Sequence, residues 1–536
     1  MSTLQTEFSA ENRSKLRAWN LKQISDRITS CSMPTNQFYK LKKVFAFAAK
    51  LCVFIFCCIL TGAAQDLDIK IKILPSSPVR VEEKILNPQI ESESLEISFP
   101  KNYADVSELG TRLADLELFD ETGAKIEFKK LAAGEFRAEK PPAILSYNVK
   151  VEVPENPASA AHVSWLAAKR GILMTGDLLP QWKDGRKVSA KITFELPNNW
   201  KITSRETKTS ENVFAVEDVE KAIFLVGQNQ REKTTQIDKT DLNLAISGEW
   251  KFSDDEALEM ATEILMEYRK MFGAIPTKQA QIFLLPFPSP LSPPRSVNSD
   301  RWRAETRGAT VTIISGAIAS KREAVQRLHE QLRHEIFHLW IPNAVNLTGN
   351  YDWFYEGFTV YQALRTGVFM NQIRFEDYLN TLAAAFDLAK NQNVSLLEIS
   401  NRRWLGGNNS VYAKGMVTAF LCDLAILDQS NGKHSLTEIF QKVYRKYHAS
   451  NVPTDGSAAV LEILKSYPEL QTIVQNYIEG AMKIEWRNEL ERFGIEVFES
   501  GDGTQLKVTS APSGRQKDLL DKLGYNQWRK LLRTKK

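Results

Sequence analysis

The sequence predicts a multidomain fold, in which an N-terminal all-β domain precedes a larger α+β domain that is mostly helical. Runs that alternate apolar and polar residues, at 67–73, 95–99 and 147–153, are typical of half-buried strands. Over 254–272 the apolar residues instead recur at the spacing of one helix face. A chain of 536 residues is long enough for roughly two to four domains.

Four segments follow from these patterns. Residues 1–65 form an N-terminal extension with a signal peptide or signal anchor, and residues 66–240 form a β-sandwich-like domain. Residues 241–492 form the larger domain, and residues 493–536 form a C-terminal hairpin with a basic tail. The polar and charged stretch 227–241 is predicted to link the two domains.

The N-terminal extension has the residue order of an export signal. Lysines at 40, 42 and 43 precede the apolar run 51–60, and the small residues 61–64 follow. Cleavage after Ala64 is one prediction, with Met33 as an alternative start. An uncleaved anchor over 44–64 is the other. In both cases we expect the body of the protein to be exported, as a periplasmic, secreted or membrane-anchored protein.

Charge and cysteine content narrow the classes of protein. Residues 1–65 hold nine Lys or Arg and three Asp or Glu, while the whole chain has a net charge of +4. The remaining residues therefore carry no excess of positive charge, and we expect no nucleic-acid partner. Cys422 is the one cysteine beyond residue 65, so no disulfide can form within the body. We expect it to be a small buried apolar residue.

Two histidines four residues apart, His334 and His338, are the most informative feature of the larger domain. Residues 321–340 are predicted to form one helix, capped by Ser320 and ended by Pro342. Residues at i and i+4 lie on one helix face, where two neutral imidazoles can bind one Zn²⁺. The competing interpretation is a solvated amphipathic helix with ordinary polar residues.

Two glutamates complete the predicted centre. Glu356, in a helix predicted from Asp352 to Thr366 with Gly367 as its terminator, supplies a third ligand. A fourth position stays open for water, and Glu335 is placed to take its proton. The sequence thus predicts one Zn²⁺ per chain. The alternative for Glu356 is a carboxylate that only favours the helix dipole.

Tyr412 is a further candidate, in Tyr412-Ala413-Lys414-Gly415 ahead of the apolar run 416–427. A tyrosine hydroxyl can donate to the oxyanion that develops on a scissile carbonyl, although a lone tyrosine near a helix start is more often a packing residue. His162 has no ligand-like neighbour in the sequence, and we expect it to be structural.

These motifs resemble those of the gluzincin zinc peptidases. His-Glu-x-x-His, then Glu-Gly-Phe, then Tyr-x-Lys-Gly is the order in the aminopeptidase N family. The match to the glycyl aminopeptidase family is closer, in the runs His334-Glu335-Ile336-Phe337-His338-Leu339-Trp340 and Glu356-Gly357-Phe358-Thr359-Val360-Tyr361. The resemblance implies a thermolysin-like peptidase domain, peptide or protein substrates, and a transition-state role for Tyr412. It also implies that a strand such as 310–314 edges the cleft.

Three departures limit what the resemblance implies. The ligand gap from His338 to Glu356 is seventeen residues, one fewer than in aminopeptidase N. The stretch 306–314, equivalent to the amine-reading segment of the aminopeptidases, has no acidic residue beyond Glu305. Too few residues follow the larger domain for the PDZ domain of the glycyl family. The activity is therefore that of an aminopeptidase or of an endopeptidase of restricted specificity. A non-catalytic exported binding protein is the alternative from another class, and the oligomeric state stays open.

Overall fold

The computed structural model describes residues 65–74, 78–87, 95–182, 186–288, 302–316, 320–405, 408–501 and 503–527. The predicted export signal therefore lies outside the described residues.

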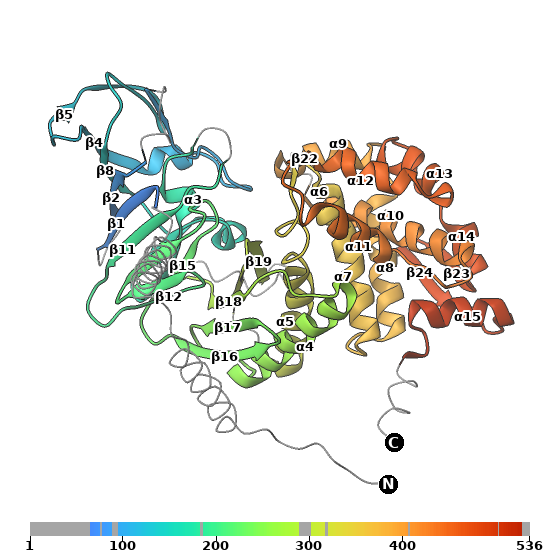
Figure 1. Ribbon diagram of the computed structural model, residues 1–536. Coiled ribbons are helices and arrows are strands. Elements are labelled where there is room, and N and C mark those ends of the chain that lie inside the picture. The colour runs from blue at the N-terminus through green and yellow to red at the C-terminus, as the bar shows by residue number, and fades with distance from the viewer. Residues whose placement is uncertain are drawn as a thin grey trace, which may run out of the picture. The chain divides into compact units, whose positions relative to one another are not determined.

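An eight-stranded sheet forms the main part of the N-terminal region, drawn in blue to green in Figure 1. Its pairs are antiparallel except that β1 and β11 run parallel. Alternate residues of β1 are buried, as the sequence pattern predicted. In sheet order the strands are β13 (Thr207–Ser210), β14 (Val213–Val216), β11 (Ala190–Glu195), β1 (Leu67–Ile73), β2 (Val79–Ile85), β8 (Ile144–Val149), β4 (Leu113–Phe119) and β5 (Lys125–Ile126).

Two smaller sheets complete this region and confirm the predicted all-β domain. An apolar core that includes Ile69, Tyr147, Phe194 and Phe224 joins the large sheet to them. A four-residue helix, α3 (Thr175–Leu178), interrupts the strands. One sheet contains β12 (Lys201–Ser204), β15 (Ile223–Gly227), β10 (Arg170–Met174) and β9 (Trp165–Ala167), and the other β3 (Glu96–Ser98), β7 (Glu135–Ala138) and β6 (Phe128–Ala132).

A five-stranded mixed sheet begins the larger domain. Its strands, in order, are β16 (Arg231–Ile237), β17 (Thr240–Ile246), β18 (Gln279–Pro286), β20 (Thr310–Ser315) and β19 (Trp302–Arg307). Both faces of β18 are buried: Ile282 and Leu284 belong to the core of the larger domain, and Phe283 and Leu285 pack with Trp165 of the N-terminal region. Burial on both faces explains the unbroken apolar run in its sequence.

Two sequence predictions about this sheet are wrong. Residues 231–237 of the predicted linker form the edge strand β16. Their sequence is as polar as that of a linker because Ile237 is the only fully buried residue of this strand. The strand at 310–314 does not edge the cleft, because β20 is buried along its length and β19 lies outside it. The β16–β17 hairpin spans the predicted domain boundary at residue 240, so that boundary stays a prediction.

Helices form most of the remaining chain. α4 is capped by Ser253, and its apolar residues face the core at the predicted spacing. α4 and α5 pack together and against the five-stranded sheet. The helices are α4 (Asp254–Phe272), α5 (Lys321–Phe337), α6 (Asp352–Tyr355), α7 (Gly357–Phe369), α8 (Phe375–Ala389), α9 (Leu396–Asn401), α10 (Asn408–Gln429), α11 (Thr437–Tyr447), α12 (Gly456–Lys465), α13 (Gln471–Ile473), α14 (Arg487–Arg492) and α15 (Gly514–Leu523).

Two strand pairs accompany the helices. β23 (Ile495–Ser500) and β24 (Gly503–Val508) form the hairpin predicted near the C-terminus. β21 (Leu347–Thr348) pairs in parallel with β22 (Thr454–Asp455), close to the loop that leads into α6.

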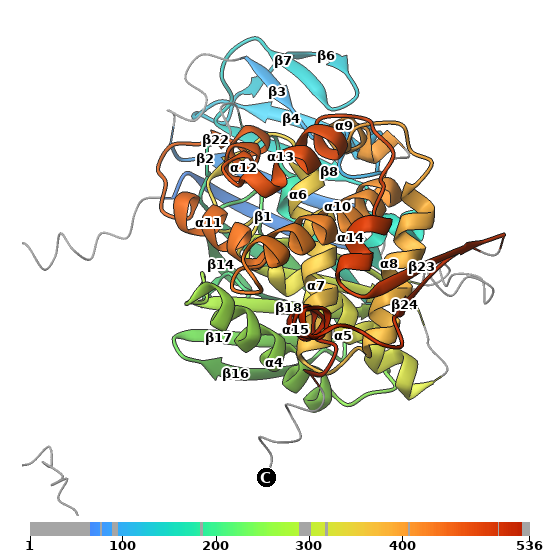
Figure 2. The same cartoon turned by 90° about the vertical axis from the view of Figure 1, so that its right-hand side faces the viewer.

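α10 is the central helix of the helical part, with α7 and α8 against it (Figures 1 and 2). Among the described residues it is the one helix long and apolar enough to cross a membrane, but 83% of its apolar window is buried inside the protein. That burial is typical of a core helix. Cys422 lies on it and is buried, as predicted.

Two glycines hold α7 against α10. A Cβ on Gly415 would lie 2.4 Å from the Cα of Gly357, and a Cβ on Gly357 would lie 2.8 Å from the Cα of Gly415. Real Cβ atoms do not approach backbone atoms so closely, so both positions require glycine. Glu356 precedes one of these glycines and Tyr412 lies one turn before the other. The contact therefore sets the spacing between these two side chains.

A Gly415→Ala variant should lose about 1–3 kcal/mol of unfolding free energy, because the added methyl group must push two helix backbones apart. Chemical denaturation measures this loss. Gly514→Ala is the matched control: no atom lies within 4 Å of a Cβ at that position, so its stability should stay near that of the wild type. Equal stability of the two variants would contradict the close helix contact.

Candidate metal centre

α5 carries the two histidines into a cleft. Ser320 caps the helix by accepting a hydrogen bond from the backbone N–H of Glu323 at 3.1 Å, as predicted. Leu328, Leu332 and Ile336 bury one face of α5 in the core. The helix ends at Phe337, three residues earlier than predicted, and His338 is its C-cap.

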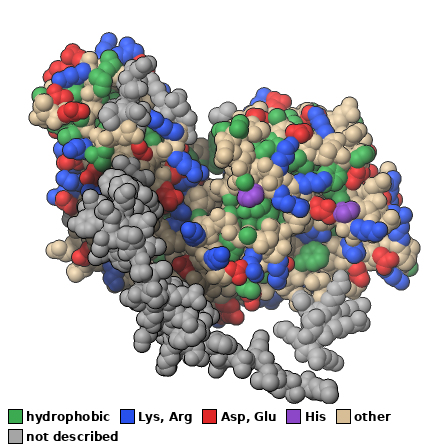
Figure 3. All heavy atoms as spheres, in the orientation of Figure 1, with side chains coloured by type: hydrophobic (Ala, Val, Ile, Leu, Met, Phe, Trp, Pro, Cys, Tyr) green, Lys and Arg blue, Asp and Glu red, His purple; other side chains and the backbone are tan. Residues whose placement is uncertain are grey.

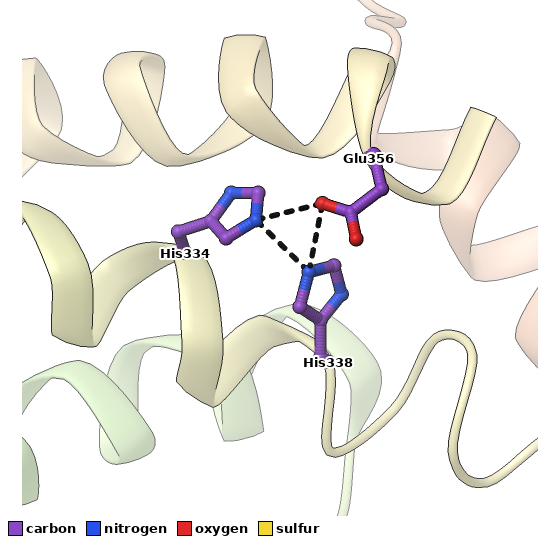
Figure 4. Close-up of side chains that lie close together, drawn as sticks. All are labelled: His334, His338 and Glu356. Atoms are coloured by element: carbon purple, nitrogen blue, oxygen red, sulfur yellow. Dashed lines mark hydrogen bonds and ion pairs between the residues drawn. The ribbon is translucent and has the colours of Figure 1, made fainter. Parts of the chain in front are cut away.

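Three ligand atoms converge in this cleft, as Figure 4 shows. Nε2 of His334 lies 3.0 Å from Nε2 of His338 and 3.0 Å from Oε2 of Glu356. Nε2 of His338 lies 3.5 Å from the same Oε2. The structure therefore brings together the three predicted ligands, which come from two separate segments.

The donor set fits one zinc ion. The point equidistant from the three atoms is about 1.8 Å from each of them, close to the usual zinc–ligand distance of about 2.0–2.1 Å, so these three side chains could hold a zinc ion. The Nδ1 of His338 lies 2.9 Å from the carbonyl oxygen of Ile341. Because that nitrogen donates its proton to the carbonyl, Nε2 of His338 keeps a free lone pair for a metal.

A break between two helices aims Glu356 at the histidines. The predicted single helix is wrong: α6 ends at Tyr355 and α7 begins at Gly357, so Glu356 lies at the junction. Gly367 does not end the helix either, since α7 continues to Phe369. The glycine leaves space instead, because a Cβ there would lie 2.5 Å from Cδ1 of Ile373 and 2.7 Å from the guanidinium carbon of Arg333 and would displace both side chains.

Arg403 orients the ligand carboxylate. Its Nη1 lies 3.2 Å from Oε1 of Glu356, the oxygen that does not face the histidines, and 3.0 Å from Oδ2 of Asp352. Burial raises the pKa of Glu356, but Arg403 and His338 outweigh burial and hold that pKa well below its usual range. Glu356 is therefore an ionised, fixed acceptor, as a metal ligand must be.

Glu335 is buried beside the two histidines, and its side chain takes no part in the ligand triangle. Its Oε2 lies 2.7 Å from the hydroxyl of Thr306 on β19. Burial raises the pKa of Glu335 above its usual value, and His334 and His338 offset only part of the effect. A carboxylate held in place with a raised pKa is suited to accepting a proton near neutral pH.

Tyr412 reaches the same site from α10, inside the helix rather than at its start. Its ring packs edge-on to that of His334, with centroids 6.1 Å apart. The hydroxyl accepts a hydrogen bond from Nη2 of Arg403 at 2.9 Å and donates its own proton toward the carboxylate of Glu356. Burial raises the pKa of Tyr412, so the hydroxyl stays protonated.

Sequence reasoning missed Thr306, Arg403, Asp352 as a partner of Arg403, and Asn343. The amide of Asn343 donates to the carbonyl oxygens of Thr306 and His338 and accepts from the N–H of Gly308, so it ties β19 and β20 to the end of α5. No spacing or motif marked these residues. Their roles arise from contacts between elements distant in the sequence.

Glu305 is held by its own partners on the same cleft wall. Tyr103 donates to it, Nδ1 of His162 lies 2.6 Å from its Oε2, and Arg307 lies 3.1 Å from its Oε1. Burial raises the pKa of Glu305, but Arg307 and His162 overcome that effect and lower it to about 2. His162 is thus a positioning residue for a carboxylate, which agrees with a structural role.

A Tyr412→Phe variant should fold and bind zinc while the catalytic rate falls by the equivalent of about 2.7–4 kcal/mol, the usual effect of removing one oxyanion donor. Steady-state kinetics on a peptide substrate measures the loss. Tyr477→Phe, a half-buried tyrosine outside the cleft, serves as the control. A rate within a factor of about two of the wild-type rate would show that Tyr412 takes no part in catalysis.

Comparison with known proteins agrees with this architecture. Residues 66–223 match the Peptidase M61 N-terminal domain, which places the match within the predicted β domain. No curated protein sequence matches the chain at a significant level.

Solved structures share the two-domain fold. An aminopeptidase N family protein from Idiomarina loihiensis superposes with a TM-score of 0.67 and 15% identity, over 81% of this chain and 79% of that one. An M1 zinc metallopeptidase from Deinococcus radiodurans gives 0.51 and 16%, over 78% and 95%. At these identities the likeness establishes the fold: an N-terminal β domain followed by a helical domain, as in M1 and M61 peptidases.

Proposed function

We propose that this protein is a zinc-dependent metallopeptidase. The observation that carries the proposal is the ligand triangle of His334, His338 and Glu356, with side lengths of 3.0, 3.0 and 3.5 Å and the carboxylate of Glu335 beside it. The family match of the N-terminal domain and the M1-like fold point to the same class of enzyme.

The roles of the residues follow from their positions. A zinc ion bound here would lower the pKa of a water molecule and polarise the scissile carbonyl. Glu335 accepts the proton of the attacking water and then gives it to the leaving amine. Tyr412 donates to the oxygen of the scissile carbonyl as negative charge develops on it. Thr306 and Arg403 keep Glu335 and Glu356 in position.

The choice between terminal and internal cleavage depends on Glu305. A resemblance to aminopeptidases favours an enzyme that binds the free amino terminus of its substrate. Such an enzyme needs a carboxylate in the cleft to pair with the positively charged amine. The one acidic residue on β19 already binds Arg307, His162 and Tyr103, so a substrate amine must compete with them. This pairing favours the second candidate, an endopeptidase of restricted specificity.

Export is also part of the proposal, and it rests on the lysines, apolar run and small residues of positions 40–64. Sequencing the amino terminus of protein recovered from producing cells tests it. Protein that begins after Ala64 indicates a cleaved signal, whereas an intact cytoplasmic protein contradicts export.

A peptide-library digestion tests the activity directly. Purified protein is incubated with peptides that have free or acetylated amino termini, with and without a zinc chelator. Chelator-sensitive cleavage supports the proposal, and the termini of the products distinguish an aminopeptidase from an endopeptidase. A folded, zinc-loaded protein that cleaves nothing would favour the non-catalytic binding protein.

A further inference from the structure

The guanidinium of Arg333 is a buried positive charge without a carboxylate partner. Arg333 precedes His334 on α5 and is only 4% exposed. Its Nη1 lies 2.7 Å from Nδ1 of His329, one helical turn earlier. Among the described residues this is the only hydrogen-bond partner of the guanidinium, which leaves most of its N–H groups without an acceptor.

His329 adds a second unsatisfied donor. Because a guanidinium can only donate, Nδ1 of His329 accepts, and the proton of the neutral ring is on Nε2. Burial, followed by the charge of Arg333, lowers the pKa of His329 to about 3, so the ring is neutral. Both Nε2 of His329 and Nε of Arg333 are buried and without a hydrogen-bond partner. The pair is therefore cationic and has only donors left.

Among the described residues no carboxylate forms an ion pair with Arg333, although the charge of Glu330 offsets part of its burial. Glu330 pairs with Arg327 at 2.9 Å, and Asp377 pairs with Arg374 at 2.7 Å. The carboxyl of Glu335 takes its hydrogen bond from Thr306 on β19. A buried cation without a counter-ion and with free N–H groups is unfavourable for the folded state, so a stable protein gains from an anion that completes it.

The neighbouring helix α7 lies close to this guanidinium. A Cβ on Gly367 of α7 would lie 2.7 Å from both Cζ and Nη1 of Arg333. A glycine inside a helix costs about 0.5–1 kcal/mol relative to alanine. Here the glycine leaves space for the side chains of Arg333 and Ile373, both of which an added Cβ would displace.

Arg333 and His329 line the same cleft as His334 and Glu335, a cavity of about 2080 Å³. We propose that Arg333, supported by His329, binds a carboxylate of the peptide substrate, so that the enzyme prefers substrates with an acidic group at one position. The inference rests on the proposed peptidase function. The carboxylate is that of an Asp or Glu side chain or of the substrate's C-terminus. The planar guanidinium can donate two parallel hydrogen bonds to either kind of carboxylate.

The preference for an acidic group would arise from Arg333 itself and not from the charge of the whole surface. On the face of the molecule drawn in Figure 3, Lys and Arg side chains are interspersed with Asp and Glu. The described surface in that view has no broad positive field that would attract acidic peptides in general. Recognition then depends on Arg333, the buried cleft arginine that forms no ion pair among the described residues, which makes it testable by single substitutions.

Isosteric peptide pairs provide the test. The full-length, zinc-loaded protein is given peptides that differ only by Glu or Gln at each position in turn, with acetylated and amidated ends. A second pair differs only by a free or amidated C-terminus. We expect kcat/KM to favour the charged member by roughly tenfold or more at one position, as for a charge-assisted bidentate pair. The responding pair shows whether a side chain or the C-terminus supplies the carboxylate.

Substitutions assign the preference to Arg333. Arg333→Met should bring the Glu-to-Gln ratio of kcat/KM to about one, because the charge that distinguishes the two peptides is lost. Arg269→Met, which removes one arginine from α4 outside the cleft, should keep the wild-type ratio. If Arg333→Met does not fold, the comparison of peptide pairs on the wild type still decides whether the preference exists.

Two results would overturn the inference: equal rates for both members of every pair, or a preference that persists in Arg333→Met. If no peptide is cleaved at all, the peptidase proposal fails instead. In that case binding of the fluorescently labelled Glu and Gln peptides to the zinc-loaded protein, measured by anisotropy, tests the site alone. Tighter binding of the Glu peptide would support it, and equal binding would refute it.

Discussion

A Glu335→Gln variant is expected to retain its zinc and to lose about 10²–10⁴-fold in turnover, the usual contribution of a positioned general base. The amide has nearly the same size as the carboxylate and can still accept the hydrogen bond from Thr306, which reaches Oε2 at 2.7 Å. It cannot accept the proton of a water molecule. Since Glu335 is not one of the three ligands, the metal site should be unaffected.

Two measurements on the same sample check this prediction: zinc content by elemental analysis, and kcat on a peptide identified by the library digestion. Glu330→Gln is the matched control, because it removes a carboxylate from the same helix at an exposed position. Loss of zinc together with activity in Glu335→Gln would mean that Glu335 holds the metal, and the assigned roles would then be wrong.

A His338→Ala variant is expected to lose the metal and, with it, all zinc-dependent cleavage. The three ligand atoms lie within 4.8 Å of one another and come from α5 and the α6–α7 junction. Removal of one of three protein ligands leaves two, too few for a stable catalytic zinc site. Loss of the ion removes several kcal/mol of transition-state stabilisation at once.

Zinc content after dialysis, and activity on adding back zinc, measure this effect. His434→Ala is the control: His434 is exposed on the surface, where it pairs with Glu438, so zinc content and rate should match the wild type. A His338→Ala protein that still binds one zinc per chain would show that the histidine pair is not the metal site.

The local sequence predicted what short-range physics determines. The i, i+4 spacing placed His334 and His338 on one helix face, and the Ser320 cap marked where that helix begins. Strict alternation located β1, and helical spacing located α4 to the residue. These features depend on neighbours within a few residues along the chain, so one sequence was sufficient.

Features that depend on distant contacts could not be predicted in this way. Gly367 appeared to be a helix terminator because a glycine often is one, whereas it lies inside α7 and leaves space for the side chains of Arg333 and Ile373. The edge strand β16 appeared to be a linker because it has a single buried residue. Arg403 lies forty-seven residues after Glu356, and no motif connects them, although it fixes the orientation of that carboxylate.

The zinc content of the purified full-length protein tests the central claim most directly. Elemental analysis after extensive dialysis should give one zinc per chain for the wild type, and Glu356→Gln, which weakens the carboxylate ligand, should give much less. A wild-type protein that is folded, contains no zinc and does not take it up when the metal is added would contradict the proposed metal centre.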